Sequence, residues 1–345
     1  MTEVQKKAKV GRPRTSEPNK VIPKEGIVTR PQNWDEKFKQ KINIMEMVYD
    51  NPKTISKLFV LIDELGTGPI YMFFRRTKVE MHFKSGEHDV YVLLKGTEMN
   101  RYYLSEPFCI KIEGSSLFKN MSDSAKNFNS IKFVINLKDL EEMKKNMRLI
   151  LVYDRKETED VFTLPISICD KNTKMPSYII PSINRLDTYP LRYDLDEAHL
   201  KQCIGNRLVQ ETIAMRISKN DDHILIYEYI KENNETEYVT NFHSATKINL
   251  ICDCEEDENI TFTISRDFIK RLTNKAISKY GTVYMSNELR FCFSYLLDPE
   301  ILEVKTGNKK EKIPVFGTEK IAIYVLLEHK SDTQNYLDRL AEVDN

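Results

Sequence analysis

The sequence predicts an α+β protein built from two repeated domains, each with antiparallel sheets and two helices. Short apolar strands alternate with single helices from residue 42 onward, and the same order begins again near residue 189. The two copies also correspond locally, because LFKNM (117–121) matches FIKRL (268–272) and SIKFVI matches GTVYMS at the same offset of 151 residues. In such a unit the sheet buries one face beneath its helices.

The first repeat begins with a strand, INIMEMVYD (42–50), and a helix, PKTISKLFVLIDEL (52–65), which carries Pro52 in its first turn. Apolar residues recur in this helix at helical spacing, at Ile55, Leu58, Phe59, Ile62 and Leu65. The later elements are the strands PIYMFFRR, KVEMHFKS, DVYVLLKG and FCIKIEG, the Ser-capped helix SSLFKNMSDSA, and the strands SIKFVI, RLILVYD and DVFTLPI.

The second repeat follows the same order. It starts with the strand YPLRYDL and the helix DEAHLKQCIG, which Asp196 caps and Gly205 ends. The strands VQETIAMRIS, HILIYEYI and EYVTNF come next, then a strand and helix in ITFTISRDFIKRLTNKAISKYG, and finally the strands TVYMSNE, RFCFSYLLD and KIAIYVLLE. We expect the helix at 265–280 to bury a stripe of Ile269, Leu272, Ala276 and Tyr280.

These patterns divide the chain into five parts. Residues 41–168 and 191–330 are the two predicted domains, and 169–190, a Pro-containing and partly apolar stretch, is expected to connect them as a loop. Residues 1–40 are polar with little apolar periodicity, which predicts a disordered basic tail. Residues 331–345 are expected to form an acidic C-terminal tail.

Positive charge is concentrated at the N-terminus, although the whole chain has 52 Lys and Arg against 52 Asp and Glu. Within the tail, Lys9, Arg12 and Arg14 flank Gly11 and Pro13 in the segment KVGRPR. This segment is similar to an AT-hook, whose narrow extended backbone fits the minor groove of A·T-rich DNA. The alternative is a solvated basic tail. Both interpretations favour a polyanionic partner.

The predicted helices also carry basic residues outside their apolar stripes. The helix at 265–280 has Arg266, Lys270, Arg271, Lys275 and Lys279, opposed only by Asp267. The other helices contribute Lys53, Lys57, Lys119, Lys126 and Lys201, with Arg207 just beyond the third. Such side chains contact phosphates without reading bases, which gives salt-sensitive and sequence-independent affinity for DNA. The alternative for each helix is an ordinary solvated face, and Asp63 and Glu64 weaken the case for the first helix.

Motifs of several other protein classes are absent from the sequence. It contains no P-loop, no Gly-x-Ser-x-Gly, no His-Glu-x-x-His and no Cys-x-x-Cys, so we predict no enzyme activity and no cofactor or metal. The acidic run at 253–258 could hold a divalent ion, but a solvated loop is the favoured interpretation. The six dispersed cysteines indicate reduced thiols in an intracellular compartment. No apolar run reaches the roughly 18 residues that cross a membrane.

Several segments resemble the DNA sliding clamps of the proliferating cell nuclear antigen type. They are FFRRTKVEMHFKSGEHDVYVLLKG, EMNRYYLSEPFCIKIEGSSLFKNM, and RFCFSYLLD followed by KIAIYVLLEHK. The likeness covers about 42–330 and is one of pattern. The segments GRPR, EGIVTRP, YDNP, RYYLSEPFCI, YPLRYDLDEAHLKQ and KINL resemble more closely the clamp-like proteins of large cytoplasmic DNA viruses, especially that of African swine fever virus. The chain departs from that pattern by an insertion-like segment at 136–147 and a longer acidic C-terminus.

This resemblance implies a DNA-clamp fold and a homotrimeric ring, with the helices lining a channel around duplex DNA. It implies a processivity factor for a viral DNA polymerase, which also docks replication and repair proteins through short peptides. By position, the peptide pocket would involve Met175, Tyr178, Ile179, Ile180, Leu326 and Leu327. A cytoplasmic replication site is implied, with the nucleus of an infected cell as the alternative. The alternative function is a transcription factor or DNA-binding scaffold of the same fold that does not close into a ring.

Overall fold

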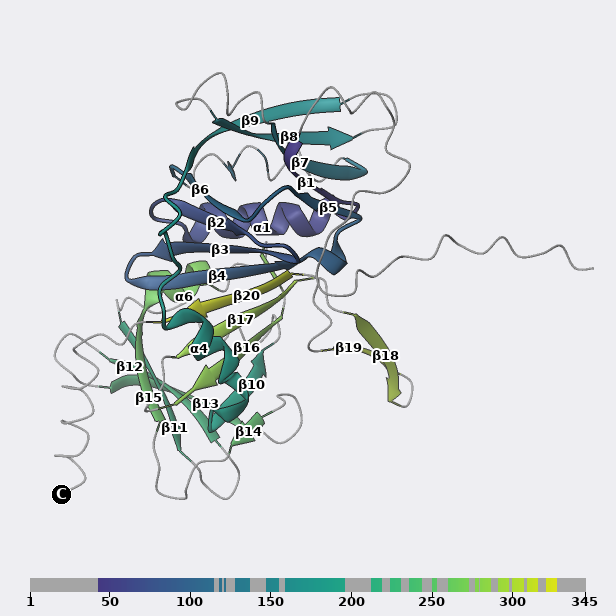
Figure 1. The fold of residues 1–345 in the computed structure, drawn as a ribbon. Helices are drawn as coiled ribbons and strands as arrows, with labels where there is room; N and C mark the ends of the chain where they lie inside the picture. The colour runs from purple at the N-terminus through teal and green to yellow at the C-terminus, as the bar shows by residue number, and fades with distance from the viewer. Residues whose placement is uncertain are drawn as a thin grey trace, which may run out of the picture.

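A computed structural model describes residues 43–114, 118–119, 121, 128–136, 147–154, 159–195, 212–218, 224–230, 236–243, 250–252, 260–272, 277–278, 280–286, 291–297, 300–306, 309–315 and 321–327. Two successive sets of antiparallel strands, accompanied by a few helices, make up this part of the chain (Figure 1). No helix among these residues is long and apolar enough to cross a membrane.

The first half contains one long helix, α1 (Pro52–Leu65), with the bounds predicted from the sequence. Pro52 stands where a missing N–H costs no intrahelical bond, and the N–H of Gly66 closes the helix by donating to the carbonyl of Ile62 at 2.9 Å. The strands of this half are β1 (Asn43–Tyr49), β2 (Ile70–Phe74), β3 (Lys78–Ser85), β4 (His88–Lys95), β5 (Arg101–Leu104), β6 (Phe108–Ile112), β7 (Ser130–Asn136), β8 (Met147–Asp154) and β9 (Glu159–Ile168), with a short 3₁₀ turn η2 (Gly96–Glu98).

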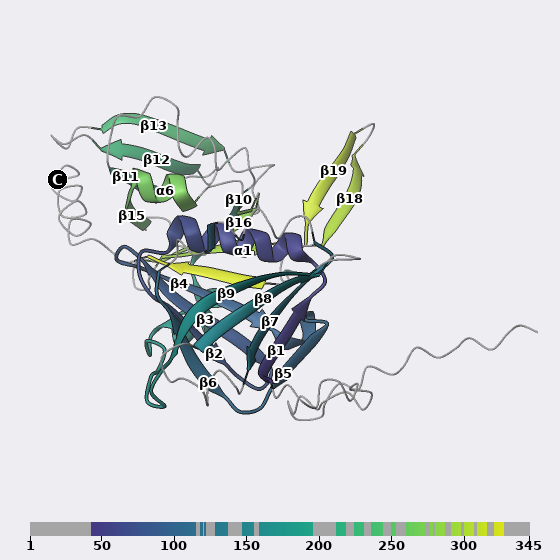
Figure 2. The same cartoon turned by 90° about the horizontal axis from the view of Figure 1, so that it is seen from above.

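The second half repeats this order and adds a hairpin. Its strands are β10 (Leu191–Leu195), β11 (Thr212–Ser218), β12 (Ile224–Ile230), β13 (Thr236–His243), β14 (Leu250–Cys252), β15 (Ile260–Ser265), β16 (Gly281–Met285), β17 (Cys292–Leu297) and β20 (Ile321–Leu326), with α6 (Arg266–Leu272) after β15. The hairpin of β18 (Ile301–Thr306) and β19 (Lys309–Pro314) is inserted between β17 and β20 and projects away from the sheets (Figure 2). This hairpin was not predicted from the sequence.

One sheet runs through both halves. It has 14 strands in the order β14-β10-β16-β17-β20-β4-β3-β2-β6-β9-β8-β7-β1-β5, whereas β13-β12-β11-β15 form a separate four-stranded sheet. The halves join where β20 pairs with β4 in antiparallel register, from Ile321 opposite Leu94 to Leu326 opposite Asp89. We call this pairing the junction.

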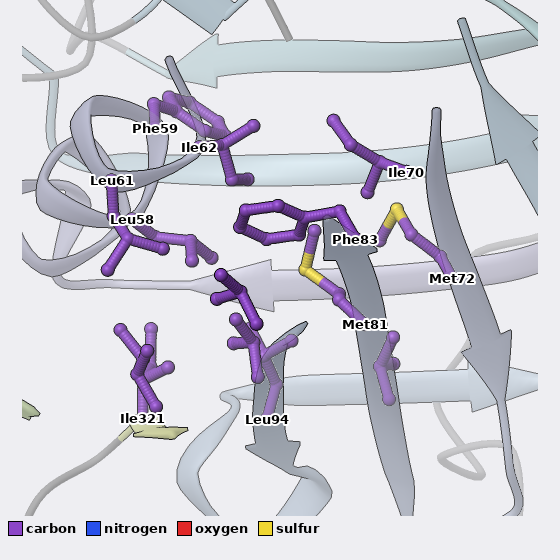
Figure 3. Packing of buried hydrophobic residues seen from close by; sticks show 14 of the residues in the cluster. Leu58, Phe59, Leu61, Ile62, Ile70, Met72, Met81, Phe83, Leu94 and Ile321 are labelled. Carbon is purple, nitrogen blue, oxygen red and sulfur yellow. The ribbon is translucent and has the colours of Figure 1, made fainter. Parts of the chain in front are cut away.

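The main hydrophobic core lies between α1 and the sheet at the junction. The apolar residues predicted for the stripe of this helix are all buried, namely Ile55, Leu58, Phe59, Ile62 and Leu65. Opposite α1 lie the side chains of Phe83 on β3, Leu94 on β4 and Ile321 on β20 (Figure 3). Each such side chain contributes about 1.5–3 kcal/mol when it leaves water, so α1 holds the two halves together as well as covering the sheet.

The extent predicted for the helix at 265–280 is wrong. The helix α6 ends at Leu272, and Ile277, Ser278 and Tyr280 are not helical. The hydroxyl of Ser278 donates to the carbonyl of Tyr280 (3.0 Å) and accepts from its N–H (3.2 Å). Such local bonds to the backbone compete with helix formation. Of the predicted stripe, Leu272 is buried and Tyr280 is only half-buried, while Phe268, which was not predicted, is buried.

The connecting stretch 169–190 is more ordered than the predicted loop. It contains the helix α4 (Ile179–Asn184) and the 3₁₀ turn η4 (Leu186–Thr188). Pro181 does not prevent the helix because it lies in the first turn, where its backbone nitrogen needs no helical partner. We call residues 169–190 the connecting segment.

Several predictions lie outside the described residues. These are both tails, the helix at 196–205, the insertion-like segment except its two end residues, the acidic run at 253–258, and the helix at 115–125 apart from Phe118, Lys119 and Met121.

Candidate partner-peptide and nucleic-acid surfaces

The two faces of the junction are covered by different parts of the chain. Side chains alternate between the faces of a strand, so Val90, Val92 and Leu94 of β4 join the core under α1. Tyr91 and Leu93 of the same strand belong to a second apolar cluster with the connecting segment. The junction therefore lies between α1 on one side and the connecting segment on the other.

The second cluster has a buried centre and a half-buried rim. Tyr91, Ile179, Cys292 and Leu326 expose 2% or less of their surface, and they come from β4, α4, β17 and β20. The half-buried members of the rim are Leu93, Met175, Tyr178, Ile180, Ile183, Leu186, Tyr284 and Tyr324. An apolar rim around a filled centre offers a shallow surface on which an apolar peptide side chain could pack.

A buried carboxylate lies at the edge of this cluster. Asp89 is fully buried, and its Oδ1 lies 2.8 Å from His82 Nε2 and 2.9 Å from Lys84 Nζ. Its Oδ2 accepts a hydrogen bond of 2.6 Å from the hydroxyl of Tyr178. Burial acts to raise the pKa of Asp89, but the bonds from His82, Tyr178 and Lys84 outweigh it and lower that pKa to about 2. The carboxylate is therefore ionised and fixed at neutral pH.

A second buried carboxylate lies two residues before His82 on β3. Glu80 accepts a hydrogen bond from the hydroxyl of Tyr91 (3.0 Å) and pairs with Lys78 (2.8 Å) and Arg75 (3.2 Å). Burial acts to raise its pKa, and these bonds lower it overall. Tyr91 thus joins the apolar cluster to the polar stripe of β3.

The structure brings five of the six predicted pocket residues together. Met175, Tyr178, Ile179, Ile180 and Leu326 share the second cluster, whereas Leu327 is buried in the main core. Ile179 and Leu326 have no exposed surface, so they can support the surface but cannot touch a partner. The residues available for contact are the half-buried ones.

Glu80, His82 and Asp89 were not predicted from the sequence as site residues. A signal was present, because KVEMHFKS alternates polar and apolar residues and so places Lys78, Glu80, His82 and Lys84 on one face of β3. Alternation alone predicts a solvated face. The connecting segment approaches this face and changes that outcome.

The basic residues of α1 and α6 reach the same side of the sheet. The two helices contact each other, and Figure 2 shows both on one side of β4 and β20. Lys53 and Lys270 are exposed, and Lys57 and Arg271 are half-exposed. Lys119 is also exposed, and Arg266 begins α6. The other predicted DNA-contacting residues lie outside the described part of the chain, namely Lys9, Arg12, Arg14, Lys126, Lys201, Arg207, Lys275 and Lys279.

The charges of α1 oppose its own dipole. Its first turn has no acidic residue and its last turn no basic one. Lys53 and Lys57 lie near the positive end, and Asp63 and Glu64 near the negative end. Such placement costs a helix up to about 1 kcal/mol per charge. By contrast, α6 has Asp267 in its first turn and Lys270 and Arg271 in its last, as the dipole favours. The N-terminal half of α1 is therefore a concentrated source of positive potential.

No cluster of three or more potential metal ligands occurs among the residues that the structure describes.

No protein-family model matches the sequence, and no curated protein matches it. Among solved structures, the chain is similar to the crystal structure of Proliferating Cellular Nuclear Antigen from Entamoeba histolytica, with a TM-score of 0.57 at 9% sequence identity. The match covers 84% of this chain and 100% of that chain. The predicted α+β fold with repeated antiparallel sheets is thus confirmed, and the chain has a fold of the proliferating cell nuclear antigen type.

Proposed function

We propose that this protein is a DNA sliding clamp. In this proposal residues 41–168 and 191–330 are its two domains, and three chains close head to tail into a ring that encircles duplex DNA without reading its sequence. The observation that carries the proposal is the strand pairing that joins the two halves inside the chain. Two other strands, in the equivalent positions of the repeat, could make the same pairing between chains.

The internal join is made by the fourth strand of the first half and the last strand of the second half, β4 and β20. The strands in the equivalent positions are β13 and β9. Within the described residues, β13 pairs only with β12, and β9 pairs with β6 only at Ser167 and Ile168. An edge strand presents unpaired backbone groups that invite another strand. Pairing β9 of one copy with β13 of the next would repeat the internal join, and repetition of one heterologous contact gives a ring if the rotation closes.

The helices supply the surface that such a ring would turn toward DNA. Lys53, Lys57 and Lys270 lie on helices of one side of the sheet. Long cationic side chains there would hold phosphates by loose and salt-sensitive contacts, which permit sliding. The basic residues outside the described part, including the AT-hook-like tail, extend this proposal. The tail would help to recruit the protein to DNA before the ring closes.

The second apolar cluster supports a docking role. Most of its half-buried rim belongs to the connecting segment, where the resemblance implies that partner peptides bind. We propose that a DNA polymerase and other replication or repair proteins dock there, which would make the protein a processivity factor. The resemblance of segments in both halves to viral clamp-like proteins supports a viral polymerase and a cytoplasmic replication site.

The test is topological. Purified protein is incubated with nicked circular duplex DNA, washed at about 0.5 M salt to remove electrostatic binding, and then treated with an enzyme that linearises the circle. A clamp stays on the circle through the wash and leaves when an end is created. Equal loss from circular and linear DNA during the wash would contradict encirclement and favour a scaffold that does not close.

A further inference from the structure

We propose that the hydrogen bond from Tyr178 to Asp89 is a latch that fixes the connecting segment across the junction, and that Asp89 is thereby a positioning residue for the partner-peptide surface. The part of this inference that concerns peptides rests on the proposed function. The latch itself does not.

The acceptor of the latch is held in place before the connecting segment reaches it. Asp89 has no exposed surface, and one of its oxygens lies within 2.9 Å of both His82 Nε2 and Lys84 Nζ of the neighbouring strand β3. The second oxygen is directed to the Tyr178 hydroxyl at 2.6 Å. Hydrogen bonds to a charged group are about twice as strong as neutral ones. Tyr178 therefore meets a fixed and ionised acceptor.

The latch lies at the point where the two halves meet. Asp89 is the register partner of Leu326 in the pairing of β4 with β20. Ile179, the residue after Tyr178, is buried in a cluster with Cys292 of β17 and Leu326 of β20. Two adjacent residues of the connecting segment are thus anchored at the junction, Tyr178 by a hydrogen bond to β4 and Ile179 by burial in a cluster that also includes Tyr91 of β4.

The helix that follows depends on these anchors. α4 has six residues, and helices much shorter than about 12 residues are not stable alone in water. Tyr178 also begins the helix, because its carbonyl accepts from the Ser182 N–H (3.0 Å) and from the Ser182 hydroxyl (2.8 Å). Release of the Tyr178 side chain would loosen the start of α4 together with its place on the sheet.

A loosened segment would offer a weaker binding surface. Met175, Ile180, Ile183 and Leu186 of the rim all belong to the connecting segment. A partner that binds a mobile segment has to order it first, and that ordering reduces the affinity. The latch would thus act on peptide affinity without touching the peptide.

The first experiment measures the latch alone. Amide hydrogen exchange of Ser182 and Arg185, whose N–H groups bond within the segment, is compared in the full chain and in Tyr178→Phe, which removes only the hydroxyl. Tyr280→Phe is the matched control, because it removes a hydroxyl from the stretch between α6 and β16. The latch predicts about tenfold faster exchange or more in Tyr178→Phe and no change in the control. Unchanged exchange in Tyr178→Phe would overturn the proposal.

A second variant tests the acceptor. Asp89→Asn keeps the shape of the side chain but removes its charge, so the same amides should again exchange faster, while amides of α1 keep their protection. Equal loss of protection in α1 and in the connecting segment would mean that Asp89 supports the whole fold, and this would contradict a positioning role.

The third measurement links the latch to binding. The probe is a fluorescein-labelled dodecapeptide with three apolar or aromatic residues on one helical turn. Its affinity should fall about threefold or more in Tyr178→Phe and stay unchanged in Tyr280→Phe. Equal affinity in both variants would overturn the link to peptide binding. A probe that does not bind the unmodified chain would count against the proposed docking surface, whereas the exchange experiment still decides the latch.

Discussion

The last strands of the two halves, β20 and β9, occupy the same place in the element order but have different surroundings. β20 pairs along its length with β17 and β4, and five of its six residues are buried. β9 pairs with β8 from Glu159 to Ile166 but reaches β6 only through its last two residues, and it leaves 59% of Val161 exposed. One strand completes a join inside the chain, whereas its counterpart lacks a second strand partner along most of its length among the described residues.

The sequences of the two strands reflect this difference. IAIYVL is apolar throughout, as expected for a strand covered on both faces. EDVFTLPISI alternates and contains Pro165, a residue that occurs mainly in edge strands. The repeat thus has the same strand in two different settings. It completes the junction in one half, and in the proposed ring it would join the next subunit in the other.

The largest expected effect is a difference in the free energy of unfolding between a substitution at the junction and one on the open edge of β9. Leu94→Ala removes a side chain that is 1% exposed and lies opposite Ile321. It should lower the free energy of unfolding by about 2–5 kcal/mol. Val161→Ala on β9 should change it by less than about 0.5 kcal/mol. Urea unfolding followed by circular dichroism measures both, and similar losses for the two variants would remove the distinction.

Backbone substitutions on β9 test whether one side of this strand joins the subunits. Thr163 and Pro165 are two residues apart, so their nitrogens face the same side of the strand, and we expect that side to be the open edge. Thr163→Pro should leave the fold intact and weaken subunit association about tenfold or more, because it removes a donor for the neighbouring strand. Phe162→Pro should instead destabilise the fold through the β8 ladder. Sedimentation at several concentrations, with thermal melts, distinguishes them. Unchanged association of Thr163→Pro would exclude this edge.

A smaller effect concerns the helix that covers the junction. Replacement of Lys53 and Lys57 by Gln should reduce the slope of log affinity against log salt by about 0.9 for each lost phosphate contact on duplex DNA. The control replaces Lys95 and Lys171, two exposed residues at the end of β4 and on the connecting segment, and should keep the slope. Fluorescence anisotropy with labelled duplex provides the measurement. Equal slopes in both double variants would place the DNA contact elsewhere.

The smallest expected effect is a titration at the junction. The pKa of Asp89 is about 2, below its ordinary value of 3.8, so its bonds contribute stability above about pH 4. That contribution is lost as the pH falls from about 4 through 2. The carboxyl carbon signal of Asp89 in NMR should titrate with a midpoint near 2, and at higher pH in Lys84→Met. An ordinary midpoint in the unmodified chain would contradict the network.

Local patterns predicted the elements around the junction well. α1 has the predicted bounds because its apolar spacing, its initial proline and its final glycine all lie within the segment itself. The α4 helix and the hairpin of β18 and β19 were not predicted. The first contains a proline and is too short for helical periodicity to be visible. The second, ILEVKT with KKEKIP, is rich in charge and has no clear alternation.

The residues of the candidate site also differ in how far local patterns could indicate them. The apolar residues Met175, Tyr178 and Ile179 were assigned to the pocket through the family resemblance, by their position between the repeats, and the structure places them in one cluster. The burial of Asp89 could not be predicted, because its partner Tyr178 is 89 residues away in the chain. Pro165 is a local sign of an edge strand in β9. Which sides of β9 and β13 lack a strand partner within the described residues depends on the pairing of distant strands, which local patterns do not contain.

The most direct test of the central claim is the mass of the purified protein at low micromolar concentration, measured by light scattering with and without duplex DNA. The chain has a mass of 40.5 kDa. A closed ring predicts a mass of about 120 kDa, that of a trimer, once the contribution of DNA is subtracted. A protein that remains a monomer under both conditions would contradict the ring and, with it, the assignment of β9 and β13 as the strands that join its subunits.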